Sequence, residues 1–172
     1  MKSAIVFLLA CEACGRIFFD PRADAKVYAI DAGECPPGYM FMNPGCYRVV
    51  LADPEATWFV AEAKCEADVF GAHLVVLDTA FEAQQVDSIV PGTILDHWIG
   101  ANDIVNEGVF LTVTNVPMAY ATWAMTQPDG ATASNCVVFN DDTTLYDYDC
   151  SRIDDYVCEY DGIAAVPAAW GQ

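Results

Sequence analysis

The sequence predicts an α+β domain that is stapled by disulfide bonds. Two observations support this fold class. Helix-like patterns come early in the chain and short strand-like patterns come late, an order that is typical of α+β domains. Six of the eight cysteines are spread between residues 35 and 158, which is typical of a disulfide framework formed outside the reducing cytosol. The spacing alone does not decide how these cysteines pair.

The first half of this region predicts a hairpin, two helices and a buried strand. Apolar runs that predict strands lie at 39–42, 46–50 and 73–77. An amphipathic helix is expected to open at Pro54 and to end near Gly71. Thr79, with Glu82 three residues later, forms a capping box that predicts a second helix ending at Ile89.

From residue 97 onward the pattern changes to short strands separated by polar loops. The expected strands lie at 98–100, 109–113, 122–124, 135–139, 145–147 and 156–160. The tail, residues 161–172, is rich in alanine and broken by Pro167. We therefore expect this tail to be flexible.

The N-terminus, residues 1–11, resembles a signal segment for export. Lys2 precedes an apolar run at 4–10, which is typical of a secretory signal and too short to span a bilayer. The run into Cys11 also resembles a bacterial lipoprotein box, in which Cys11 would be lipidated and would anchor the chain to a membrane. The alternative is a buried apolar segment with stray thiols. Residues 12–34 predict a tether.

The charge of the chain excludes one class of partner. There are 25 acidic side chains against 7 Lys and Arg, a net charge of -18, so the field repels nucleic acid and anionic lipid headgroups. We expect no nucleic-acid partner, and contact with a membrane only through a lipid anchor. Two uses of the acidic residues stay open: solubility, or convergence of some carboxylates on a divalent cation.

The order and spacing of several motifs carry a resemblance to a known family. They are the six cysteines, Trp98-Ile99-Gly100, the run Glu107 to Phe110, Trp123 four residues before Gln127-Pro128-Asp129, and Cys150 eight residues before Cys158. Together they resemble the long form of the C-type lectin-like domain, over residues 35–160. The resemblance implies two helices flanking small antiparallel sheets, a long loop at about 101–136, and the disulfides Cys35–Cys46, Cys65–Cys158 and Cys136–Cys150.

The resemblance also implies a calcium-assisted glycan site of the galactose type. Gln127 and Asp129, on either side of Pro128, match two ligands, and Asp147 matches a third. Tyr146 is expected to lie beside them and offers a ring to a sugar. Two positions depart from the family pattern, because Ser134 stands where glutamate is usual and Tyr146 stands where asparagine is usual.

A second, auxiliary calcium site is implied by three further residues. Asp103 and Glu107 are four residues apart after the Trp98-Ile99-Gly100 motif, and Asn135 precedes Cys136. Gly130 departs from the pattern because it offers no side-chain ligand. The alternative is that these carboxylates simply face water in a very acidic protein.

The sequence therefore predicts a secreted or cell-surface module that binds a glycan or glycoprotein, with Ca²⁺ as the cofactor. The alternative is a calcium-independent domain of the same fold that binds a protein partner. No nucleophile, base and carboxylate set is visible, so we expect no enzyme. His73 and His97 border apolar strands and are expected in the core.

Overall fold

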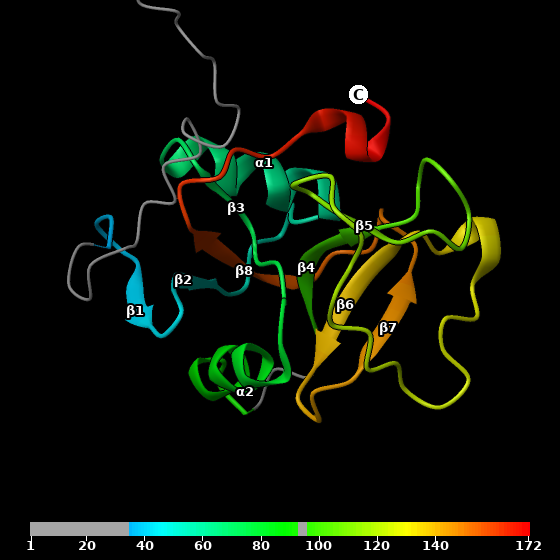
Figure 1. Cartoon of the computed structure of the whole chain (residues 1–172), viewed down its shortest axis with the longest axis horizontal. Coiled ribbons are helices and arrows are strands. Elements are labelled where there is room, and N and C mark those ends of the chain that lie inside the picture. Colours follow the sequence, from blue (N-terminus) through cyan, green and yellow to red (C-terminus); the bar gives the residue numbers. More distant parts are fainter. Residues whose placement is uncertain (1–34, 93–95) are drawn as a thin grey trace, which may run out of the picture.

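The computed structural model describes residues 35–92 and 96–172. The expectations for residues 1–11, Cys11 and the tether at 12–34 lie outside the described residues. In chain order the elements are β1 Met40–Met42, β2 Gly45–Val50, α1 Trp58–Asp68, β3 Ala72–Leu74, α2 Ala80–Ile89, β4 Asp96–Asn102, β5 Leu111–Thr112, η1 Ala131–Ala133, β6 Cys136–Asn140, β7 Leu145–Tyr148, β8 Asp155–Tyr160 and η2 Pro167–Trp170 (Figure 1). None of the described helices is long and apolar enough to cross a bilayer.

The strands form one sheet in the order β1-β2-β8-β4-β6-β7, with β3 paired to β8 and β5 paired to β4. Every pair is antiparallel except β4 with β8, which is parallel. The small antiparallel units expected from the sequence are therefore joined through β4 and β8. Successive residues of β4 enter different cores: Trp98 packs with Trp58 of α1, and Ile99 packs with Val86 of α2. Figure 1 shows the sheet between the two helices.

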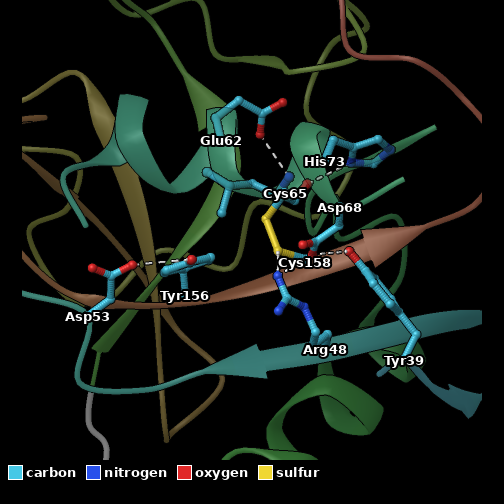
Figure 2. The surroundings of a disulfide bond; sticks show 10 residues. Tyr39, Arg48, Asp53, Glu62, Cys65, Asp68, His73, Tyr156 and Cys158 are labelled. Atoms are coloured by element: carbon cyan, nitrogen blue, oxygen red, sulfur yellow. Dashed lines mark hydrogen bonds and ion pairs between the residues drawn. A yellow bond between two sulfur atoms is a disulfide. The ribbon is translucent and has the colours of Figure 1, made fainter. Parts of the chain in front are cut away.

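All three disulfides implied by the resemblance are confirmed. Cys35–Cys46 ties the start of the domain to β2, and Cys136–Cys150 closes the β6–β7 unit. Cys65–Cys158 joins α1 to β8 across 93 residues (Figure 2). Closing so long a loop stabilises the fold by about 4 kcal/mol in a chain-entropy description.

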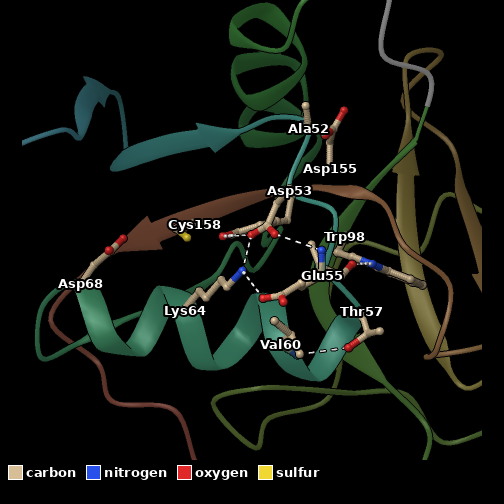
Figure 3. A network of polar contacts seen from close by, with 12 residues as sticks. Ala52, Asp53, Glu55, Thr57, Val60, Lys64, Asp68, Trp98, Asp155 and Cys158 are labelled. Atoms are coloured by element: carbon tan, nitrogen blue, oxygen red, sulfur yellow. Dashed lines mark hydrogen bonds and ion pairs between the residues drawn. The ribbon is translucent and has the colours of Figure 1, made fainter.

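The first helix begins later than the sequence predicted. It starts at Trp58 and not at Pro54, because Thr57 is the N-cap and its side chain accepts a hydrogen bond from the Val60 amide. The segment before it is held outside the helix, since Asp53 forms an ion pair of 2.5 Å with Lys64 (Figure 3).

The capping box of the second helix is half confirmed. The Thr79 hydroxyl accepts a 3.1 Å hydrogen bond from the Glu82 amide, as expected. The Glu82 carboxylate accepts instead from the Asp78 amide and the Tyr47 hydroxyl. This glutamate therefore links α2 to β2 as well as capping the helix.

Three buried glutamates from three elements hold the segment between β3 and α2. They accept the backbone amides of alternate residues: Leu74 to Glu62 at 2.7 Å, Val76 to Glu159 at 3.0 Å, and Asp78 to Glu82 at 2.9 Å. Glu62 lies on α1, Glu159 on β8 and Glu82 on α2. Burial raises the pKa of Glu62 to about 7 and that of Glu159 to about 8.

The tail at 161–172 is ordered, contrary to the expectation. Trp170 is 6% exposed, and its ring meets that of Trp58 edge-on at 5.8 Å. The Val166 amide also donates to the Val113 carbonyl at 2.7 Å. Burial of the Trp170 indole offsets the entropy lost in ordering a short segment. The alanine-rich composition of the tail did not indicate that this tryptophan would be buried.

Both histidines lie in the core, as predicted. His97 on β4 is 1% exposed, and neither ring nitrogen has a hydrogen-bond partner among the described residues. Its ring packs edge-on against Phe139 at 5.1 Å. Burial lowers the pKa of His97 to about 4, so the fold excludes the charged form.

Replacing His97 by leucine is expected to remove a source of acid sensitivity. The pKa of histidine in the unfolded chain is about 6.5, above the folded value, so the unfolded state takes up the proton first and wild-type stability falls as pH drops through this window. The difference in unfolding free energy between His97→Leu and wild type should grow by about 2.5 kcal/mol between about pH 7.5 and 4.5. Urea unfolding at several pH values measures it, and parallel pH curves for the two proteins would contradict this account.

Candidate functional site

The long loop between β4 and β6, together with β7, forms a pocket of about 310 Å³. Its lining residues are Asp103, Glu107, Gly108, Phe110, Pro128, Asp129 and Asp147. Four carboxylates that the sequence assigned to two separate sites therefore share one pocket. Glu107 and Asp129 are exposed at its rim, whereas Asp103 and Asp147 are each 3% exposed.

Asp103 is positioned by the turn that follows β4. Its amide donates to the Asn135 carbonyl at 3.1 Å, and its Oδ2 accepts the Gly108 amide at 2.8 Å. Gly108 has φ +77°, a conformation that favours glycine. This turn leaves Glu107 at the surface, one residue before the glycine.

Asp147 closes the other side of the pocket from β7. Its Oδ1 accepts the Asp129 amide at 3.0 Å and its Oδ2 accepts the Gly130 amide at 2.9 Å. The Asp147 amide donates to Gln127 Oε1 at 3.1 Å. The Gln127–Pro128 peptide bond is cis, as in the family motif. Gln127 and Asp147 are thus brought together, but by hydrogen bonds within the protein.

Ser134 allows this loop to close tightly. A Cβ placed on Gly130 would lie 1.9 Å from the Ser134 Cβ and 3.0 Å from Asp147 Oδ2. Glycine is therefore required at position 130. The small serine, which stands where the family has glutamate, packs directly against it.

Tyr146 does not reach the pocket. Side chains alternate along β7, so Tyr146 packs against the core that contains Trp58 while Asp147 faces the loop. Its ring stacks on Tyr148 at 6.2 Å, and the Arg152 guanidinium lies 4.1 Å from the Tyr148 ring centroid. The predicted role of Tyr146 beside Asp147 is therefore not supported by its position.

Phe110, for which no role was expected, forms the apolar wall of the pocket. Its ring packs against Trp123 at 4.8 Å. The available signal was its place within the Glu107 to Phe110 run, two residues after the glycine that the turn requires.

Two side-chain oxygens beside the pocket accept no hydrogen bond from the described residues. Asp103 Oδ1 and Asn135 Oδ1 are buried and have no partner among the described residues. The pKa of Asp103 is raised, first by burial and further by the charges of Glu107 and Asp147. Asp103 is therefore a buried acid with one unsatisfied oxygen, and an added positive charge beside it would stabilise its charged form.

The donor sets differ in how well they suit calcium. The set of Gln127, Asp129 and Asp147 does not fit, because both Asp147 oxygens already accept loop amides and Gln127 Oε1 already accepts the Asp147 amide of β7. The auxiliary set fits by its chemistry, since Asp103 and Asn135 each keep a free oxygen and hard cations prefer such ligands. No group of three or more His, Cys, Asp or Glu side chains converges as a metal cluster within 35–92 and 96–172.

Within the part of the chain that the structure describes, no Lys or Arg is free to pair with this pocket. Of the seven Lys and Arg residues of the full chain, four precede residue 35. The other three are Arg48, Lys64 and Arg152, and each forms an ion pair with aspartate elsewhere in the fold.

The fold and this loop pocket define a disulfide-stapled ligand-binding domain. The family model described as "Lectin C-type domain" matches residues 55–160, so the chain belongs to the C-type lectin domain family. This is a family of binding domains and not of enzymes. The chain is 31% identical over 140 residues to an alpha-N-acetylgalactosamine-specific lectin from Patiria pectinifera. The matched region covers 73% of this chain and 82% of that protein.

Other relatives are longer than the region they share with this chain. The human C-type lectin domain family 3 member A is 34% identical over 73 residues, covering 41% of this chain and 36% of its own length. Among solved structures, the mouse scavenger receptor C-type lectin carbohydrate-recognition domain has a TM-score of 0.66 at 25% identity, covering 73% of this chain and 97% of that one. A calcium-independent type II antifreeze protein gives a TM-score of 0.66 at 24% identity, covering 77% and 96%, which shows the shared fold.

Removing the Asp147 carboxylate is expected to release the loop locally. Each amide bonded to a carboxylate is stabilised by about 1.5 kcal/mol, so Asp147→Ala should lower hydrogen-exchange protection of the Asp129 and Gly130 amides by about tenfold each. Asp147→Asn, which keeps one carbonyl oxygen, should release only one of them. Asp141→Ala in the exposed β6–β7 turn is the control. Loss of wild-type protection on adding EDTA would show that a metal, and not Asp147, holds these amides.

Proposed function

We propose that the protein is an extracellular carbohydrate-binding module of the galactose type. The observation that carries the proposal is the Gln127-Pro128-Asp129 tripeptide, held by Asp147 at the rim of an acidic pocket in a C-type lectin domain. The Patiria relative, whose name specifies alpha-N-acetylgalactosamine, supports this choice of sugar. Three disulfides are consistent with a secreted or cell-surface location.

The chemistry of the rim suits a sugar. The exposed carboxylates of Asp129 and Glu107 accept hydrogen bonds from hydroxyl groups. Phe110 offers an apolar wall to the C–H face of the ring. Calcium, bound through Asp103, Glu107 and Asn135, would supply positive charge among the acids and hold the loop.

A second candidate function is calcium-independent binding of a protein partner through the same face. One observation favours it: the Asp147 carboxylate already holds the loop amides that a metal would otherwise organise. The two candidates differ in their response to EDTA and to free sugar.

Retention on immobilised N-acetylgalactosamine tests the first candidate. Wild type should be retained in millimolar calcium and eluted by free galactose but not by mannose. Asp129→Asn should weaken retention by about tenfold, since it removes a charged acceptor worth about 1.5 kcal/mol, whereas Asp141→Asn should not. If the resin fails to retain the protein both with calcium and with EDTA, the carbohydrate proposal is wrong.

Calcium assistance has a separate readout in thermal stability. Millimolar calcium should raise the melting temperature by a few degrees through binding to the folded state alone. The shift should disappear in the double variant Asp103→Asn, Glu107→Gln and persist in Asp141→Asn. An unchanged melting temperature for wild type would remove calcium from the proposal and favour the second candidate.

A further inference from the structure

The loop pocket combines features that suit an organic cation. Of its acidic residues, Asp103 and Glu107 come from the turn after β4 and Asp129 comes from the tripeptide segment, while Phe110 and Pro128 supply apolar surface beside them. An amphipathic cation needs both: an apolar wall for its alkyl stem and carboxylates for its charged end. A simple metal ion makes no use of the aromatic wall.

An independent observation points to a missing ligand. Asp103 is 3% exposed, lines the pocket, and keeps Oδ1 without a hydrogen-bond partner among the described residues. A buried carboxyl oxygen left without a hydrogen-bond partner is costly. The three cations of the described domain are already paired elsewhere, so the missing donor comes from outside this domain.

We propose that this pocket binds the lysine side chain of a basic partner protein. The alkyl stem would lie along Phe110 and Pro128, and the ammonium group would sit among the carboxylates of Asp103, Glu107 and Asp129. An ammonium group has three donors on one compact charge, which suits carboxylates that approach from separate segments. The net charge of -18 favours association with such a partner. This site goes beyond the sugar-binding proposal and does not depend on it.

The test uses Nα-acetyl-lysine methylamide in EDTA, with chemical shifts of the Gly108 and Phe110 amides as the readout. Saturable shifts are expected at these amides, and the Nε-acetylated compound, which keeps the stem but loses the charge, should bind at least about fivefold more weakly. Glu107→Gln should weaken binding by a similar factor. Phe110→Leu should also weaken it, because the ring face is lost.

Asp141→Asn is the matched control, since it removes one exposed acidic charge in the β6–β7 turn, outside the residues that line the pocket. It should change binding by less than about twofold. Equal binding of the acetylated compound, or equal weakening by Asp141→Asn and Glu107→Gln, would overturn the proposal and leave only a diffuse acidic field. Calcium should compete with the lysine compound. Failure on the sugar resin leaves these results unaffected, so the two proposals are tested separately.

Discussion

The arrangement of the fold depends on how the segment from Leu74 to Asp78 is held between β8 and β4. Its neighbours bond to it on one side, where the Val75 amide donates to Val157 and its carbonyl accepts from Gly100. On the other side none of the described strands pairs with it, and the alternate amides donate to Glu62, Glu159 and Glu82. Each glutamate belongs to a different element, so one short segment fixes α1, α2 and β8 relative to one another. The same segment explains Gly100, because a Cβ there would lie 2.5 Å from the Leu74 carbonyl oxygen.

The functional loop repeats this use of a carboxylate as an acceptor for backbone amides. Asp147 accepts two amides from the tripeptide region, and Asp103 accepts one from its own turn. In a chain with so few cations, backbone N–H groups take over the role of pairing these buried carboxylates. The acidic composition is thus partly structural. Simple solubility, the plainer interpretation of the net charge, does not account for these residues.

The fold is predictable from the sequence because its signals are local or ordered along the chain. Three signals agree with the structure: the six cysteines of the disulfide framework, the Trp98-Ile99-Gly100 motif and the cap at Thr79. Each acts through neighbouring residues or through a covalent bond. Trp170 was missed because its partner, Trp58, lies more than a hundred residues away in the chain. The start of α1 was misplaced because the Asp53–Lys64 ion pair holds the preceding segment outside the helix.

The candidate site was harder to predict for the same reason. The sequence named the acidic residues but divided them into two sites, whereas the loop closure around Gly130 and Ser134 gathers them into one pocket. Tyr146 was expected beside Asp147, yet adjacent residues of a strand face opposite ways. The loop's own amides donate hydrogen bonds to the Asp147 carboxylate. Asp103 Oδ1 has no hydrogen-bond partner among the described residues, and Asp103 lines the same pocket as Phe110. Since the protein already satisfies the Asp147 carboxylate, the unsatisfied Asp103 oxygen is the place where an added positive charge would be stabilised.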